Sequence, residues 1–310
     1  MTERAEFPLV WDNSMRSCFV ECPWKFEKEY LRHYRPLRQS VHLHAGKAFA
    51  AALETARLAF YRDKLPQEDC EALGLEMLIK EYGDYECDPG SNKALHRMIE
   101  ALAYYFRTFP FEYDDVQPYM GKNGPMVEFS FALPLSEKLR HPVTDEPLIY
   151  SGRADMVATF AGALSIYDDK TTSSLGASWA AQWDRRSQFS GYAWAARAMN
   201  IPISQIVIRG IAILKTKIEA AQAISVRTPH HVAEWHAQAV RDISRAKAMW
   251  EEGFWDKNLA DACSSFGGCM FKQACGAEDP APYLFSNFAQ RKWNPLTREE
   301  ETIGEGNGNS

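Results

Sequence analysis

The sequence predicts an α/β fold in which a mixed central sheet is flanked by helices and follows a helical N-terminal third. Three observations support this prediction. Apolar residues recur at helical spacing up to about residue 110, strand-type alternation begins near residue 126, and strand-type and helical segments then alternate to about residue 250. Segments in this order are typical of one α/β or α+β unit around a single hydrophobic core.

The helical N-terminal part spans about residues 14–110. Its first segment, up to residue 34, has helical spacing that Pro23 interrupts directly after Cys22, because proline disrupts a helix interior but suits its first turn. Two short helices around this junction are therefore expected. Alanine-rich or apolar periodicity predicts three further helices, over residues 45–64, 67–83 and 92–109.

The α/β core that follows is expected over about residues 125–255. Alternating apolar and polar residues predict strands over 126–135, 148–160 and 163–171, and an Ala-Gly pair at 161–162 joins the last two as a hairpin. The remaining predicted elements are a helix over 177–199, strands over 205–216 and 219–228, and a long helix from about Pro229 to Trp250.

The domain organisation follows from these segments. We expect one domain over residues 1–295, which ends with a cysteine-rich closing segment over 260–280. The last residues, 296–310, are polar and glycine-rich, so a disordered tail is expected there.

Composition limits the kind of protein this can be. The chain has 310 residues, of which 46% are hydrophobic and 25% charged, and its formal net charge of -6 argues against a nonspecific polycation. The N-terminus lacks the pattern of a secretory signal, and eighteen apolar residues never occur in succession. We therefore expect a cytoplasmic protein of a bacterial cell or phage-infected host, without membrane association.

Acidic residues gather at the ends of the two hairpin strands. Asp155 lies in the strand "SGRADMV", and Asp168 ends the next strand in "IYDDKT". A hairpin closing at 161–162 places these two carboxylates opposite each other, where like charges destabilise a sheet unless a cation neutralises them. Carboxylate oxygens suit Mg²⁺ or Mn²⁺, so the pair predicts a divalent-metal site.

A lysine completes this arrangement. Lys170 lies two residues beyond Asp168, so the alternation of a strand places both side chains on one face and that of Asp169 on the other. A metal beside an ammonium group can bind a phosphodiester and stabilise the charge that develops during hydrolysis. An isolated Asp-Asp-Lys run is usually a charged turn, but the facing Asp155 and the apolar run "ALSIY" favour the functional interpretation.

These motifs resemble the PD-(D/E)XK nuclease superfamily, in particular its RecB-like exonuclease branch. The resemblance implies a restriction-endonuclease-like sheet and a metal-dependent DNA exonuclease, acting in recombination or repair. It places Asp155 and Asp168 as metal ligands, together with the backbone carbonyl of Asp169, and gives Lys170 the role of orienting or activating the attacking water.

The helix that follows carries a second motif of this branch. Gln188 and Tyr192 in "QFSGY" match its Q-x-x-x-Y signature and lie one helical turn apart, which implies a role in binding the DNA strand and supporting the active site. Trp179 and Trp183 precede this motif in the sequence and Arg209 follows it, and the three have the chemistry of a single-strand channel. Tryptophans four residues apart are nevertheless usually core residues.

One position departs from the family pattern. The branch commonly has G-x-x-x-H on an early helix, whereas here "GKAFA" starts at Gly46 and has Ala50 in place of the histidine ligand. His44 and Glu54 are the candidate replacements. Glu128 in "MVEFSF" resembles an acidic residue of some members and is a candidate additional ligand.

The cysteines form a second constellation. Cys263, Cys269 and Cys275 are evenly spaced after the last long helix and need a fourth ligand, for which Cys22 before "PWKF" is the natural candidate. Several RecB-like nucleases bind a [4Fe-4S] cluster with one early and three late cysteines, and the resemblance implies the same here. The late spacing differs from the usual C-x₂-C-x₅-C, which leaves Zn²⁺ as an alternative.

Two alternative functions remain open at this point. The first is a noncatalytic DNA-binding recombination subunit with the same fold, which the missing histidine favours and the intact acidic and lysine residues oppose. The second is a nuclease that trims DNA ends in a CRISPR adaptation complex. For a recombination exonuclease of phage type, a single-strand annealing protein is the expected partner.

Overall fold

The chain forms two compact units, each assembled from segments that are distant in the sequence. The computed structural model describes residues 4–259, 261–264 and 268–303. The first unit comprises Met1–Arg38, Phe131–Gly152 and Glu234–Ser310, and the second comprises Gln39–Ser130 and Arg153–Ala233. Strands β6 and β7 and helix α8 contribute residues to both units. The single domain expected over residues 1–295 stays a prediction.

A mixed sheet forms the centre of the second unit, as the sequence predicts. The neighbouring strands, in order, are β7 (Ile149–Phe160), β8 (Ala163–Thr172), β9 (Gln205–Ile213) and β10 (Ile218–Val226). Strand β8 runs antiparallel to β7 and parallel to β9, and β10 returns antiparallel to β9. Short strand β3 (Gln117–Pro118) and strand β6 (Val127–Pro134) pair with β7, and β4 (Met120–Gly121) pairs with β5 (Gly124–Pro125).

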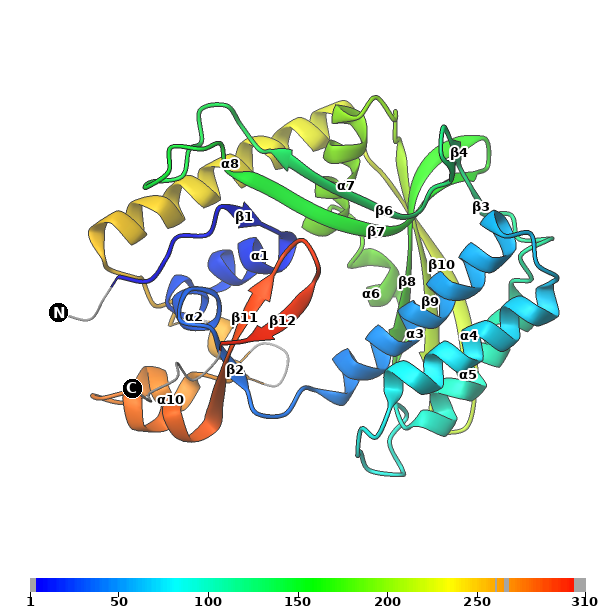
Figure 1. Cartoon of the computed structure of the whole chain (residues 1–310), viewed down its shortest axis with the longest axis horizontal. Coiled ribbons are helices and arrows are strands. Elements are labelled where there is room, and N and C mark those ends of the chain that lie inside the picture. Colours follow the sequence, from blue (N-terminus) through cyan, green and yellow to red (C-terminus); the bar gives the residue numbers. More distant parts are fainter. Residues whose placement is uncertain (1–3, 260, 265–267, 304–310) are drawn as a thin grey trace, which may run out of the picture. The chain divides into compact units, whose positions relative to one another are not determined.

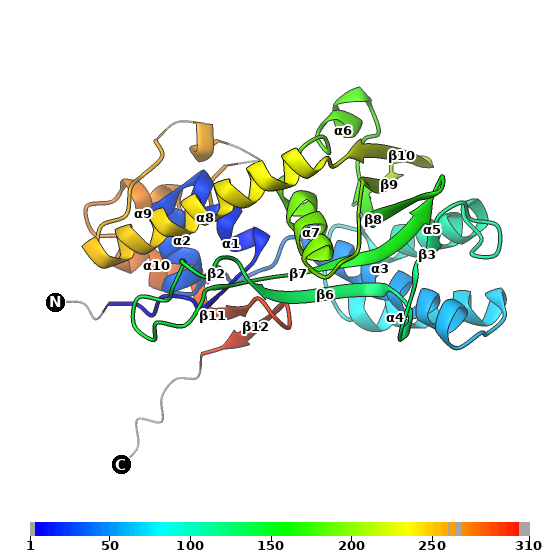
Figure 2. The ribbon, with the colours of Figure 1, turned by 90° about the horizontal axis from the view of Figure 1, so that it is seen from above.

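Helices cover both faces of this sheet. One face carries α3 (Val41–Arg57), its π-helical continuation η2 (Leu58–Arg62), α4 (Gln67–Tyr82) and α5 (Leu95–Thr108), whereas α6 (Ala177–Ala181) and α7 (Ser187–Ala198) lie on the other face (Figures 1 and 2). The apolar stripe of α3 packs on β8 and that of α5 packs on β9, because helices must bury such stripes against another element. Members of this core include Phe49, Leu53, Met98, Leu102, Ile211 and Ile213.

The β7–β8 hairpin has the predicted turn and register. Ala161 and Gly162 both adopt positive φ angles, 46° and 76°, which is the backbone twist that two-residue hairpin loops favour. Glycine adopts such angles without strain. Phe160 pairs with Ala163 at the turn, and the ladder continues to Met156 and Tyr167.

The helix expected over 177–199 is interrupted. It forms α6 and α7, and the turn between them includes Arg185 at a φ of 57°. Trp179 and Trp183 are buried, which is their expected role as core residues. A Cβ atom on Gly210 of β9 would lie 2.2 Å from the Trp179 ring, so only glycine fits at this position without a shift. Arg209, next to it, is 2% exposed and therefore is not a surface phosphate contact.

The first unit begins with short helices around the Cys22–Pro23 junction, as predicted. Strand β1 (Val10–Trp11) precedes α1 (Asn13–Glu21), α2 (Pro23–Phe26), the π-helical η1 (Glu27–Leu31) and β2 (Tyr34–Pro36). Asp12 caps α1 by accepting a hydrogen bond from the Met15 amide at 2.8 Å. Arg16 of α1 forms a buried ion pair with Asp242 of α8 (Pro229–Glu252) at 2.6 Å.

The C-terminal part of this unit is more ordered than expected. It contains η3 (Asp261–Cys263), α9 (Lys272–Gly276), α10 (Ala281–Asn287), β11 (Phe288–Asn294) and β12 (Glu299–Thr302). Strands β12, β11 and β2 form a three-stranded sheet, so residues 299–302 are a strand where a disordered tail over 296–310 was expected. Residues 304–310 of that expected tail lie outside the described residues. None of the described helices combines the length and apolar character that a membrane span requires.

Candidate active site

The two aspartates predicted as metal ligands lie next to each other at the end of the hairpin. The β7–β8 ladder ends at Met156 and Tyr167, and Asp155 and Asp168 are the next residues on the two strands. The backbone amide of Asp169 donates a hydrogen bond to Asp155 Oδ2 at 2.9 Å. The hairpin therefore holds the Asp155 carboxylate against the backbone of β8.

Asp168 is a carboxylate in an unfavourable environment. Its side chain is 2% exposed, and burial together with the nearby charge of Asp155 raises its pKa to about 7. Its charged partner is Lys170, which forms an ion pair with Asp168 Oδ2. Strand alternation places these two side chains on one face of β8, as predicted.

Glu128 of β6 belongs to the same acidic cluster. Burial raises its pKa to about 8, and the negative charges of Asp155 and Glu54 contribute in that order. Arg153 forms an ion pair with Glu128 at 2.8 Å. Glu128 also has a φ angle of 56°, a backbone conformation that costs non-glycine residues about 1–3 kcal/mol and that is concentrated at functional sites.

The charges of this cluster fit a divalent cation. Four carboxylates, Glu54, Glu128, Asp155 and Asp168, face two basic partners, Arg153 and Lys170, which leaves an excess of two negative charges. In the described part of the chain, no three Cys, His, Asp or Glu side chains are positioned to hold one metal ion as they stand. Binding a cation here therefore requires the carboxylates to exchange their ion pairs for metal bonds.

Helix α3 carries the candidate replacements for the missing histidine. Gly46 packs close to Thr171, because a Cβ on this glycine would lie 4.0 Å from Thr171 Oγ1. Ala50, one turn further, is exposed, and Glu54 follows after another turn. The charge of Glu54 acts on Glu128, which places Glu54 at the cluster.

His44 makes its described contacts elsewhere. Its Nε2 atom lies 2.8 Å from the Tyr82 carbonyl oxygen, and its ring stacks on Tyr85 with 4.2 Å between ring centroids. Tyr82 is the last residue of α4, and Tyr85 lies three residues beyond it. Of the two candidates on α3, Glu54 is thus the one that the structure brings to the acidic cluster.

The two residues of the Q-x-x-x-Y motif contact each other on α7. Gln188 Nε2 donates a hydrogen bond to the Tyr192 hydroxyl at 2.9 Å. Burial lowers the pKa of Lys170, but Asp168 and Asp155 outweigh it and raise this pKa overall, and Tyr192 adds to the increase. The motif therefore lies beside the lysine.

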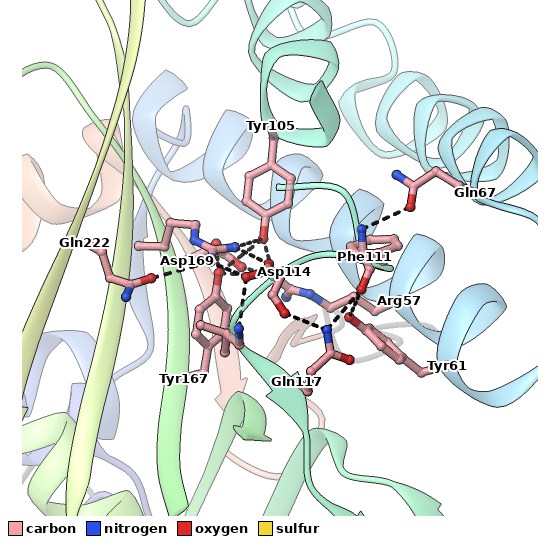
Figure 3. A network of polar contacts seen from close by, with 12 residues as sticks. Arg57, Tyr61, Gln67, Tyr105, Phe111, Asp114, Gln117, Tyr167, Asp169 and Gln222 are labelled. Carbon is pink, nitrogen blue, oxygen red and sulfur yellow. Dashed lines mark hydrogen bonds and ion pairs between the residues drawn. The ribbon is translucent and has the colours of Figure 1, made fainter. Parts of the chain in front are cut away.

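Sequence reasoning missed the residues on the opposite face of β8. The Asp169 carboxylate forms an ion pair with Arg57 of α3 and accepts a hydrogen bond from the Tyr167 hydroxyl at 2.7 Å (Figure 3). Tyr105, Asp114 and buried Arg209 continue this network. A signal for Arg57 was present, because it lies on the same side of α3 as Glu54, three residues further along.

The first unit contains a separate cavity at the cysteines. All four predicted ligands, Cys22, Cys263, Cys269 and Cys275, line one cavity of about 220 Å³. Burial raises the pKa of the Cys269 thiol, and Cys22 and Cys263 contribute to the increase. The structure therefore places the early cysteine with the three late ones.

Hydrogen bonds also link the chain segments around this cavity. The Trp24 amide donates to the Asp256 carbonyl at 2.9 Å, and the Lys257 ammonium donates to the Cys275 carbonyl at 2.9 Å. Phe271 packs on Phe288 and Trp24 behind the cysteines. These contacts connect the segment after Cys22 with the C-terminal segment around the cavity.

Comparisons with known proteins give a family match over most of the chain. The family model of the PD-(D/E)XK nuclease superfamily matches residues 14–276. No curated protein matches the chain. A crystal structure from Eubacterium rectale, named a "putative exonuclease", is 14% identical over 81% of this chain and 86% of its own, with a TM-score of 0.43. The crystal structure of SSO0001 is 10% identical over 76% and 84%, with a TM-score of 0.28.

Replacing Glu128 by glutamine is expected to stabilise the metal-free protein in a pH-dependent way. The folded-state pKa lies above the unfolded one, so the wild-type carboxylate costs nothing below about pH 4.5 and destabilises the fold increasingly as the pH rises towards 8. The pKa rises from 4.5 to about 8 and one pKa unit corresponds to about 1.4 kcal/mol, so a gain of roughly 4 kcal/mol is expected at pH 8.

Thermal unfolding in EDTA at pH 5 and pH 8 measures this effect. The control is Glu219→Gln, which removes an exposed carboxylate of β10 that pairs with Lys217. The measured quantity is the Tm of each variant minus that of wild type. If this difference for Glu128→Gln is the same at pH 5 and pH 8, or equals that for Glu219→Gln, the raised pKa assigned to Glu128 is contradicted.

Proposed function

Because this chain belongs to the PD-(D/E)XK nuclease superfamily, we propose that it is a divalent-metal-dependent deoxyribonuclease that degrades DNA from its ends. One observation carries the proposal: buried Asp168 pairs with Lys170 while the Asp169 amide holds Asp155 beside it. Two carboxylates that can hold a divalent ion beside an ammonium group suit metal-assisted phosphodiester hydrolysis.

In this proposal, Asp155, Asp168 and the backbone carbonyl of Asp169 hold Mg²⁺ or Mn²⁺, and Glu128 and Glu54 supply further oxygens. The ion contributes Lewis acidity, which makes a water more acidic and offsets the charge of the scissile phosphate. Lys170, which forms an ion pair with Asp168, would orient the attacking water and donate to the phosphate. Gln188 and Tyr192 bind the DNA strand next to Lys170.

The proposal that the enzyme is an exonuclease and acts in recombination or repair rests on the resemblance of the combined motifs to the RecB-like branch. The noncatalytic alternative rests on Ala50, the residue in place of the motif histidine. The proximity of Glu54 to Glu128 supports catalysis instead, because it supplies an oxygen ligand from the same helix.

Asp168→Asn is expected to lower the rate of Mn²⁺-dependent degradation of end-labelled linear DNA by about 10²-fold to 10³-fold, because an amide cannot replace a charged metal ligand. The rate is measured as release of label, with closed circular DNA of the same sequence alongside. Release from linear DNA alone identifies an exonuclease.

The control for this experiment is Glu219→Gln, which should degrade DNA at the wild-type rate. Equal rates for wild type and Asp168→Asn, with both proteins folded, would contradict the catalytic assignment and favour the noncatalytic subunit. Cutting of circular DNA would retain a nuclease but reject the exonuclease.

Glu54→Gln is expected to raise the Mn²⁺ concentration that gives half-maximal activity by about 10-fold, since loss of a metal contact lowers affinity. Ala50→His restores the family motif and should lower that concentration. Glu100→Gln on α5, which removes a half-exposed carboxylate paired with Arg97, is the control. An unchanged metal requirement in Glu54→Gln would remove Glu54 from the ligand set.

We further propose that Cys22, Cys263, Cys269 and Cys275 bind a [4Fe-4S] cluster. The four thiols surround a cavity rather than meet at one point, and among the described residues no three of them lie close enough to ligate one ion. This arrangement fits a cluster of several atoms better than a single tetrahedral Zn²⁺. Its role is structural, linking α1 and α2 to the C-terminal segment.

Cys269→Ser is expected to remove the visible absorbance and most of the iron of anaerobically purified protein, and to lower the Tm. Iron analysis and the absorption spectrum measure the first effect, and thermal unfolding measures the second. Cys87→Ser, whose thiol contacts the Tyr82 hydroxyl at 3.4 Å in the second unit, is the control. Zinc in place of iron in wild-type protein would favour the alternative metal, and unchanged iron in Cys269→Ser would remove Cys269 as a ligand.

A further inference from the structure

A buried polar network lies on the face of β8 opposite the candidate catalytic residues (Figure 3). Its centre is Asp169, the residue between Asp168 and Lys170 in the chain. The Asp169 carboxylate pairs with Arg57 of α3, and the side chains of this pair are 3% and 4% exposed. Tyr167, two residues earlier on the same strand face, donates its hydroxyl hydrogen to Asp169 Oδ1 at 2.7 Å.

A second layer of contacts supports this centre. The Tyr105 hydroxyl of α5 accepts hydrogen bonds from Arg57 at 2.7 Å and from Arg209 at 3.2 Å. Arg209 in turn contacts both carboxylate oxygens of Asp114, at 2.7 and 2.8 Å. Two arginines thus face two aspartates, so the buried charges of the network cancel.

The network connects to the active site through the Asp169 peptide group. The Asp169 side chain points to the network, whereas its amide donates to Asp155 Oδ2 at 2.9 Å on the catalytic side. The carbonyl of this residue is a proposed metal ligand. Fixing the side chain therefore fixes two features that the metal needs, namely the direction of this carbonyl and the position of the Asp155 carboxylate.

We infer that Arg57 and Tyr167 are positioning residues of the metal site, which act through Asp169 without contacting the ion or the DNA. The inference rests on the proposed metal-dependent nuclease function. Arg57 also neutralises Asp169, the one carboxylate of the "DDK" run that points away from the cluster. Because Arg57 neutralises the Asp169 carboxylate, the negative charge of Asp169 does not add to the repulsion between Asp155 and Asp168.

A purely structural role would produce a different result. Loss of a hydrogen bond that only stabilises the fold lowers the Tm and leaves the metal affinity of the folded protein unchanged. Loss of a bond that positions metal ligands weakens metal binding, typically by 10-fold to 100-fold for groups behind the ligands. Metal affinity therefore separates the two roles.

The test compares Tyr167→Phe with Tyr61→Phe. Each variant removes one hydroxyl from a buried tyrosine of the second unit, but Tyr61 donates to the Phe111 carbonyl at 3.2 Å, whereas Tyr167 donates to Asp169. The dissociation constant for Mn²⁺ is measured by calorimetry at 20 °C, where both variants are folded, and the Tm is measured in EDTA. Tyr167→Phe is expected to raise the dissociation constant about 10-fold and Tyr61→Phe to leave it within about twofold.

A second variant addresses the arginine. Arg57→Met leaves a buried charge on Asp169, whereas Arg57→Met combined with Asp169→Asn removes both charges. The double variant should fold more stably than the single one and still bind Mn²⁺ more weakly than wild type, because the neutral pair no longer fixes the peptide.

The outcomes distinguish this inference from the proposed function. Equal dissociation constants for the two tyrosine variants, with Mn²⁺ bound by wild type and lost in Asp155→Asn, overturn the positioning role alone. Wild-type protein that neither binds Mn²⁺ nor degrades DNA overturns both. A selective loss of affinity in Tyr167→Phe supports the inference.

Discussion

The antiparallel hydrogen bonding of β7 with β8 determines where the acidic residues lie, and the rest of the active site depends on it. Its register brings Asp155 and Asp168 together at the end of the ladder. Burying like charges side by side is unfavourable, as the raised pKa of Asp168 shows. This repulsion and the strained backbone of nearby Glu128 lower the stability of the fold. A divalent cation bound at this position would offset that loss of stability.

The alternation of side chains along β8 separates two tasks. Asp168 and Lys170 point to the catalytic face, whereas Tyr167 and Asp169 point to the network around Arg57. One strand of ten residues thus presents the reactive groups on one side and their support on the other. The parallel neighbour β9 follows the same division, because Gly210 pairs with Lys170 and Arg209 pairs with Asp169. The glycine admits Trp179, and the arginine extends the network.

Local patterns in the sequence were sufficient to predict strands β6 to β10, the hairpin turn and the facing aspartates, because period-two alternation and an Ala-Gly turn determine them. They were not sufficient for contacts between distant segments. Arg209 has the character of a surface phosphate ligand in isolation, yet Asp114, which is far away in sequence, pairs with it in the interior. The break between α6 and α7 at Arg185 also depends on packing, since the spacing over 177–199 is helical throughout.

The position of Glu54 is a second example of a contact that the sequence alone does not predict. The family motif directs attention to Ala50, and sequence spacing alone could not choose between His44 and Glu54 as its replacement. The geometry of helix α3 decides this: Gly46 lies near Thr171, so residues one and two turns later on that side lie along β8. Glu54 therefore reaches the cluster and Arg57 reaches Asp169, while His44 contacts Tyr82.

The cysteine cavity and the acidic cluster belong to different units, which constrains how one can influence the other. The cysteines lie in the first unit, and the residues proposed for catalysis lie in the second. Two strands that carry site carboxylates nevertheless contribute to both units, since Glu128 is on β6 and Asp155 on β7. Strands β6 and β7 therefore run from the unit that contains the cysteines into the unit that contains the carboxylates.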